Sequence, residues 1–143
     1  MTKKQIIILT LSAVFVVVLL LGMQRNASSS VLEGVAQRNS IEISDQKAGN
    51  KVIVSGVSLT EGGFIIIHED VLDFPMDILG ISDHIQPGKY SDITVFLGEK
   101  SVSGESMFAV LHEDDEDGVF NPEYDYSILD ADSKIVMSKF LIK

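Results

Sequence analysis

The chain has no cysteine and no tryptophan among its 143 residues. Without cysteine it can form no disulfide, no thiolate zinc site, no cysteine nucleophile and no blue-copper centre, since each of these needs a thiolate. The absence of cysteine does not indicate whether the protein is exported, because exported proteins without disulfides are common. Three histidines are the only nitrogen side chains that suit a transition metal.

Basic residues are scarce and unevenly distributed. The chain has 11 lysines and arginines against 21 acidic residues, a formal net charge of −10. Residues 1–38 have a formal charge of +3, whereas residues 39–143 carry seven lysines and twenty acids, a formal charge of −13. A region this acidic repels phosphate backbones and attracts cations, so we expect no nucleic-acid partner.

One uncharged apolar run, Ile6–Gly22, stands near the N-terminus behind Lys3 and Lys4. As a helix it would be about 25 Å long, close to the thickness of a hydrocarbon core. The preceding lysines favour an uncleaved signal anchor over residues 1–22 with its N-terminus in the cytoplasm. The alternative is a cleaved signal peptide and a secreted protein. Residues 23–38 are small and polar enough for a tether to an extracytoplasmic domain at 39–143.

From Ser40 onward the apolar residues alternate with a period of two, which is typical of β-strands. Two runs, Phe64–Ile67 and Met107–Leu111, are apolar without interruption and are predicted to be central strands. A change of phase at Ser55 and Gly56 predicts a β-bulge. Residues 69–80 contain a proline and several acids, so a crossover loop is expected there.

The pattern predicts an all-β domain, an antiparallel two-sheet immunoglobulin-like sandwich of about seven strands, preceded by one transmembrane helix. The predicted core includes Ile65, Ile67, Ala109 and Leu111. No enzyme motif accompanies this pattern: a Gly-x-Ser-x-Gly elbow, a phosphate loop and a dinucleotide fingerprint are all missing from the sequence. We therefore expect that the protein is not an enzyme.

The highest density of ionisable side chains follows the second central strand, in the run HEDDEDGVFNPEYD from His112 to Asp125. Acids at alternate positions before Gly118 resemble a calcium loop in composition, although position 12 of the calcium-loop pattern is a tyrosine here. The expected ligands are Glu113, Asp115, Asp117, the carbonyl oxygen of Val119, and Asp125 or Glu123. The alternative is a solvated acidic turn. Phe120 is expected to pack inward and anchor the loop.

Histidines form a second candidate site. His68 and His112 each follow a central strand, so they could lie side by side and bind copper or zinc. The alternative is that both are bonded to loop carbonyls and serve the fold.

Two segments of the chain are similar to each other in sequence: GGFIIIHED (Gly62–Asp70) and SMFAVLHEDD (Ser106–Asp115). With the Pro87–Gly88 turn and the run Leu111–Phe120, residues 50–142 resemble a β-sandwich domain of unknown function that recurs in archaeal surface glycoproteins and exported bacterial proteins. The resemblance implies a cell-surface module and transfers no catalytic residue. We expect a membrane-anchored surface, adhesion or structural module with a protein or glycan partner. An extracytoplasmic copper or zinc protein is the alternative, and a secreted hydrolase subunit is a minor one.

Overall fold

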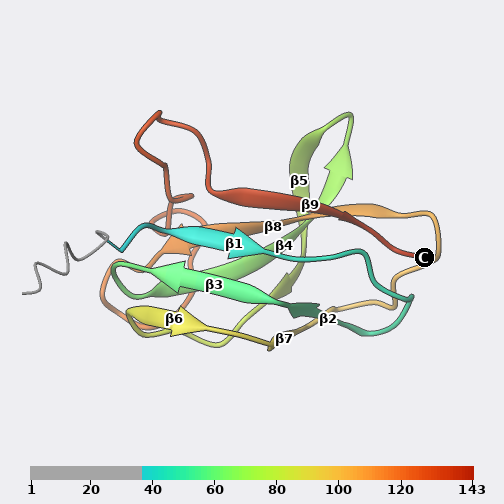
Figure 1. Cartoon of the computed structure of the whole chain (residues 1–143), viewed down its shortest axis with the longest axis horizontal. Coiled ribbons are helices and arrows are strands. Elements are labelled where there is room, and N and C mark those ends of the chain that lie inside the picture. Colours follow the sequence, from blue (N-terminus) through green and yellow to red (C-terminus); the bar gives the residue numbers. More distant parts are fainter. Residues whose placement is uncertain (1–36) are drawn as a thin grey trace, which may run out of the picture. The chain divides into compact units, whose positions relative to one another are not determined.

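The structure is a computed structural model that describes residues 37–143. This part of the chain contains nine β-strands and no helix, as expected for an all-β domain (Figure 1). The strands are β1 (Ser40–Glu42), β2 (Lys51–Val54), β3 (Gly56–Leu59), β4 (Gly63–Val71), β5 (Phe74–Ile81), β6 (Gly88–Tyr90), β7 (Ile93–Phe96), β8 (Ser106–Glu113) and β9 (Met137–Leu141). The anchor at 1–22 and most of the tether at 23–38 lie outside the described residues. Within residues 37–143, no helix has the length and apolar character needed to cross a membrane.

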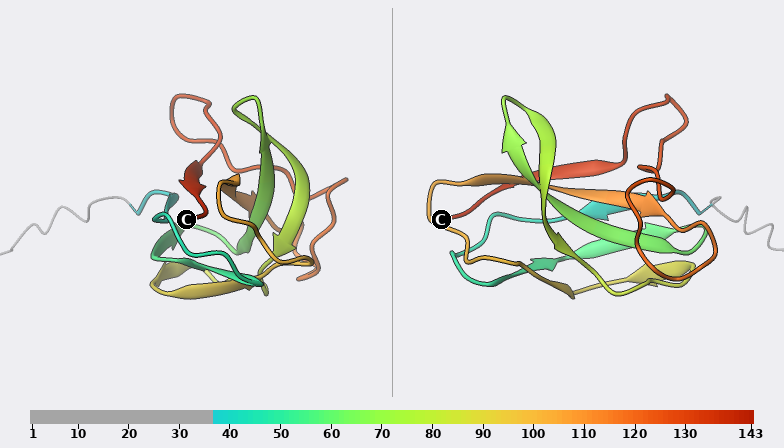
Figure 2. Two further views of the ribbon diagram at one scale, coloured as in Figure 1. Left: turned by 90° about the vertical axis from the view of Figure 1, so that its right-hand side faces the viewer. Right: turned by 180° about the vertical axis from the view of Figure 1, so that it is seen from behind.

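The strands form two layers. One layer is a four-stranded antiparallel sheet in the order β5-β4-β8-β9. The facing layer consists of the antiparallel groups β1-β3-β6 and β2-β7, in which β2 leads into β3 and β6 leads into β7 (Figures 1 and 2). Counting each of these two runs as one interrupted strand reconciles the nine observed strands with about seven predicted ones.

The core lies between the layers and is built by alternate residues of the strands. The four predicted core residues, Ile65, Ile67, Ala109 and Leu111, are fully buried, so this prediction is confirmed. The facing layer contributes mainly branched aliphatic side chains, which suit a pleated surface. They are Ile41, Val52, Val54, Val57, Leu59 and Val95.

The outer face of β4 and β8 is buried as well. Ile66 pairs with Val110 across the two strands, and these side chains are 0% and 1% exposed. Phe64 and Phe108, which lie on the same face by the alternation of strand residues, are also buried. An antiparallel sheet usually leaves one face in water, so other parts of the chain must cover this one.

The prediction of a crossover loop at residues 69–80 is wrong, because this segment forms the β4–β5 hairpin. Leu72 and Asp73 form its two-residue turn, both in the left-handed region with φ of 55° and 66°. That conformation matches the twist of a tight hairpin. Pro75 fits this strand because β5 lies at the edge of the sheet. On the outer side of an edge strand no neighbouring strand needs the backbone N–H that proline lacks.

Two short interruptions shape the facing layer. Ser55 separates β2 from β3, at the position where the sequence pattern changes phase. Ser91 and Asp92 separate β6 from β7, and Asp92 has a φ of 55°. The two interruptions lie opposite each other, because β2 pairs with β7 and β3 pairs with β6 in one unbroken antiparallel register, while β1 adds to β3 alone. Neither strand carries an extra residue between these pairs, so the prediction of a β-bulge at Ser55 and Gly56 is wrong.

Replacing Ile66 or Val110 with aspartate should unfold the domain. Either change places an unpaired carboxylate at a fully buried position, at a cost of several kcal/mol against a total stability of about 5–15 kcal/mol. Circular dichroism of the full chain in detergent during thermal unfolding measures the effect. Ile53→Asp is the control, since Ile53 is exposed on β2. Equal melting temperatures for the core and control variants would contradict the two-sided burial of β4 and β8.

Candidate functional site

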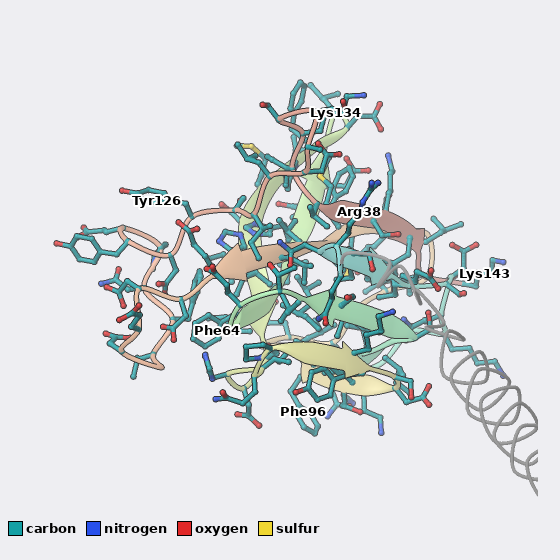
Figure 3. All side chains as sticks on the ribbon, turned by 60° about the vertical axis from the view of Figure 1, so that its left-hand side comes forward. Arg38, Phe64, Phe96, Tyr126, Lys134 and Lys143 are labelled. Carbon is teal, nitrogen blue, oxygen red and sulfur yellow. The ribbon has the colours of Figure 1, made fainter. Side chains whose placement is uncertain are left out.

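The acidic loop, residues 113–125, begins where β8 ends and lies at one end of the sandwich. Figure 3 shows Tyr126, just beyond the loop, pointing away from the sheets into solvent. Gly118 has a φ of 73° and Glu116 a φ of 80°, which turn the chain sharply between them. Side chains also shape the turn: Asp114 accepts the Gly118 N–H at 3.0 Å, and Asp117 accepts the Val119 N–H at 2.8 Å. These are the short-range bonds that aspartate makes in turns.

Asp125 organises the acidic loop from within. Its carboxylate is 1% exposed and accepts two backbone N–H groups, from Asp115 at 2.9 Å and from Asn121 at 2.6 Å. The Asp125 N–H returns a bond to the Asn121 carbonyl at 2.8 Å. A buried carboxylate needs such donors, and here the donors come from opposite sides of the loop. Asp125 therefore joins the two sides of the loop.

His112 connects the acidic loop to the sheet. Its Nδ1 lies 2.8 Å from the backbone oxygen of Asp125, and because a carbonyl only accepts, Nδ1 carries the proton. Its Nε2 lies 3.3 Å from the Ser127 hydroxyl, which can donate to it. Burial lowers the pKa of His112, and the nearby His68 adds to this, while the hydrogen bond to the Asp125 carbonyl opposes it. The neutral ring thus suits its position.

The two predicted metal histidines come together over the outer face of the sheet. His68 pairs with Phe108 and His112 with Phe64, so the buried Ile66–Val110 pair lies between them along the strands. Their rings stack with centroids 5.7 Å apart. The His68 Nδ1 donates to the Met76 carbonyl at 2.7 Å. Each ring therefore holds a backbone carbonyl through Nδ1, and the Nε2 atoms are the nitrogens that could face a metal.

A chain of ring contacts continues from the histidines to the acidic loop. Phe120 packs edge-on against His112 at 5.4 Å and against Phe64 at 5.6 Å, which confirms that it points inward. Phe64 in turn contacts the ring of His84 at 5.3 Å. The His84 Nε2 lies 3.0 Å from a carboxylate oxygen of Asp114, an electrostatic contact without hydrogen-bond geometry.

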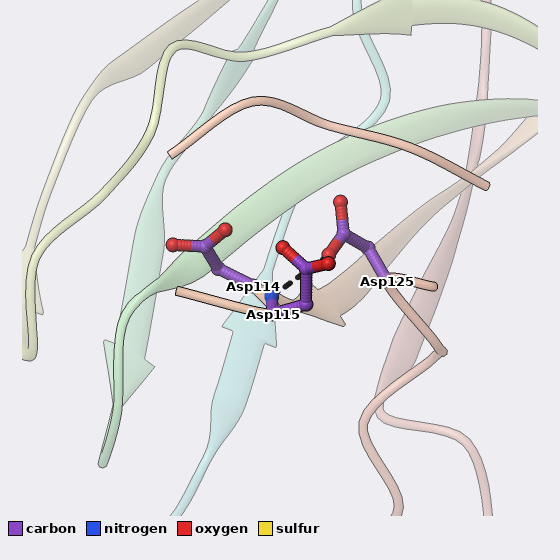
Figure 4. A group of neighbouring side chains, drawn as sticks. All are labelled: Asp114, Asp115 and Asp125. Atoms are coloured by element: carbon purple, nitrogen blue, oxygen red, sulfur yellow. Dashed lines mark hydrogen bonds between the residues drawn. The ribbon is translucent and has the colours of Figure 1, made fainter. Parts of the chain in front are cut away.

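Three carboxylates converge in the acidic loop: those of Asp114, Asp115 and Asp125, each with one oxygen within 4.8 Å of the others. Figure 4 shows Asp115 and Asp125 side by side, joined by the bond from the Asp115 backbone. Desolvation raises the pKa of Asp115, and the charges of Asp117, Asp125 and Asp114 raise it further. Mutual repulsion of this kind is what a bound cation would relieve.

This cluster overlaps only partly with the ligand set predicted from sequence. Asp115 and Asp125 belong to it, whereas Glu113 and Asp117 do not. The Val119 carbonyl stays a prediction, because the cluster consists of side-chain atoms alone. Asp114 was missed, because the expected alternation assumes that the chain continues straight after the strand. The strand ends at Glu113, the sharp turn follows at residues 116–119, and no sequence signal marks this course of the backbone.

The stability of the fold should fall as the pH drops below about 6.5. Because the pKa of His112 is lower in the folded state, the unfolded chain binds more protons in mildly acidic solution. The stabilisation from a neutral His112 is complete above the unfolded pKa and is lost as the pH falls from there through the folded pKa. Urea unfolding at pH 7.5 and about pH 5, with wild type and His112→Gln, measures it. The variant should show the smaller pH dependence, and an equal dependence would contradict the assignment.

Comparison with known proteins places the domain in a family. The chain is 35% identical over 92 residues to "Cell surface glycoprotein 2" of Haloarcula hispanica, covering 64% of this chain and 9% of that protein. It is 35% identical over 80 residues to "Cell surface glycoprotein 1" of the same organism, covering 55% of this chain and 8% of that protein. No solved structure matches. Residues 39–142 match the family described as "Domain of unknown function (DUF7282)", and the chain belongs to that family.

Proposed function

We propose that the protein is a membrane-anchored surface module, in which an extracytoplasmic, immunoglobulin-like β-sandwich has a structural or adhesion role. The similarity to two cell surface glycoproteins carries this proposal. The matched segment is less than a tenth of either relative, so the role of those whole proteins is not transferred. The apolar run Ile6–Gly22 behind Lys3 and Lys4 supports the anchor, and the acidic, lysine-poor surface of residues 39–143 suits an exposed position.

Protease treatment tests the anchor and its direction. With the N-terminus in the cytoplasm, protease added to intact cells should degrade residues 39–143, and immunoblotting with an antibody against the domain should show the loss. A cytoplasmic protein of the same cells is the control for intact membranes. Recovery of the domain in the culture medium would instead indicate signal cleavage and secretion. Protection of a cell-bound domain until the membrane is opened would refute the topology.

We further propose that the acidic loop binds calcium and that calcium stabilises the fold. Asp114, Asp115 and Asp125 offer hard oxygen ligands within reach of one ion. Two backbone N–H groups fix the Asp125 carboxylate within the cluster. A cation would therefore have to bind the Asp125 carboxylate in the orientation that these two bonds impose. Desolvation is the main cause of the raised pKa of Asp115, and the neighbouring carboxylate charges add to it, a repulsion that a bound cation would reduce.

Calcium should raise the melting temperature of the full chain. An ion that binds only the folded state stabilises it by about 2.7 kcal/mol at a hundredfold excess over Kd, and magnesium should act less because it dehydrates reluctantly. Asp114→Asn with Asp115→Asn should abolish the difference between the two ions. Glu116→Gln with Asp132→Asn removes the same charge outside the cluster and should retain it.

The same melting measurements separate the alternatives. No shift with millimolar calcium, or an equal shift in both double variants, would show that the loop is a solvated turn. A copper or zinc site at His68 and His112 is the second candidate, favoured by the stacking of the two rings. A shift with zinc that is lost in His68→Gln would support it.

A further inference from the structure

The tip of the β4–β5 hairpin presents apolar side chains to solvent. Val71 and Phe74 pair across the two strands and are 40% and 66% exposed, and Leu72 in the turn is 87% exposed. Figure 2 shows the hairpin projecting from the four-stranded sheet beyond the body of the sandwich. We call Val71, Leu72 and Phe74 the hairpin tip. Apolar side chains gathered at one projecting point often mark an interaction site.

Leu72 is unfavourable at its position in two respects. Its φ of 55° lies in the left-handed region, where a branched side chain is strained and asparagine or glycine is preferred. It is also the most exposed large apolar side chain of the described residues. Asparagine would be both less strained and better hydrated there, so neither folding nor solubility accounts for leucine. A strained, exposed residue of this kind is a reason to look for a function.

The hairpin tip is held in a defined position on the sheet. The Lys139 ammonium of β9 bridges the carboxylates of Asp70, at 2.6 Å, and Asp73. It also lies over the ring of Phe108, 5.5 Å from its centroid. The Asp70 carboxylate accepts the Asp73 N–H at 2.9 Å, which closes the turn. A surface that is already ordered loses less entropy when a partner binds.

Charge and strand chemistry restrict the partner. Glu69 and Asp77 flank the tip on a domain whose formal charge is −13, so a second copy of the chain or an anionic membrane would be repelled. Pro75 removes an N–H from the edge strand, which disfavours the addition of a partner strand there. The contact must therefore be made by side chains, from a surface of the opposite charge.

We propose that the hairpin tip is a docking surface for another protein, and that it binds a segment in which an apolar side chain is flanked by lysine or arginine. The apolar side chain packs against Leu72 and Phe74. The flanking cations lie near Glu69 and Asp77.

A single tryptophan tests this, because the chain contains none. Phe74→Trp places a fluorescent reporter at the tip, and Phe96→Trp is its matched control. Phe96 is as exposed as Phe74, at 66%, but it lies on β7 in the other layer and so does not belong to the hairpin tip. Figure 3 shows the Phe96 side chain at the surface of the molecule, on the side opposite Lys134. The probes are peptides selected from a random display library against the full chain in lipid nanodiscs, and the same peptides with each lysine and arginine replaced by glutamate.

Selected peptides should be rich in lysine or arginine beside an apolar residue, and should shift the emission of Phe74→Trp to shorter wavelength but not that of Phe96→Trp. Leu72→Asn should weaken peptide binding about tenfold while melting no lower than wild type. The charge-reversed peptides should not bind.

Four results would overturn the proposal. The first is a selection without basic residues, and the second is peptide binding that Leu72→Asn leaves unchanged. The third is a shift that grows with protein concentration in the absence of peptide, which would make the occupant a second copy. The fourth is an emission of Phe74→Trp that is already shifted to shorter wavelength in nanodiscs without peptide at every protein concentration, which would make the occupant the bilayer.

Discussion

The antiparallel ladder between β4 and β8 is the constraint on which the rest of the structure depends, because it is buried on both faces. Its inner side chains fill the space between the two layers. Its outer side chains, centred on the Ile66–Val110 pair, would face water in an ordinary two-layer sandwich. Two stacked histidines and Phe120 provide cover at this face. The acidic loop is thereby tied to the stability of the central strands.

Asp125 allows the acidic loop to close over the sheet even though the loop is rich in carboxylates. A buried carboxylate is costly unless donors satisfy it, and here it receives two backbone N–H groups from the loop that it closes. Its backbone carbonyl meanwhile accepts the Nδ1 proton of His112 and orients the ring, whose neutral form is favoured by burial. The carboxylates of Asp114 and Asp115 then gather around it as a consequence of loop closure. Asp125 thus contributes both to the candidate cation site and to the closure of the loop in the fold.

The sequence predicted the ligand set less well than the strands. Alternation led to Glu113, Asp115 and Asp117, but alternation describes a strand and ends where the strand ends. Asp114 contributes to the cluster because the backbone turns after β8, and Asp117 instead closes the turn onto Val119. The role of Asp125 as an N–H acceptor depends on Asn121 and Asp115 approaching it from two sides. Such convergence is a long-range outcome that spacing alone does not encode.

The sequence by itself determined the all-β class, the two central strands and the four predicted core residues of β4 and β8, because period-two alternation and unbroken apolar runs are local signals of burial. It also predicted the inward position of Phe120. It misread residues 69–80, where proline and acids concealed an edge hairpin. Only the tertiary structure decided that His68 and His112 stack across the sheet and that Lys139 holds the turn at Asp73. These contacts join residues that are distant in the chain, and the free energy of each depends on the geometry of the whole sandwich.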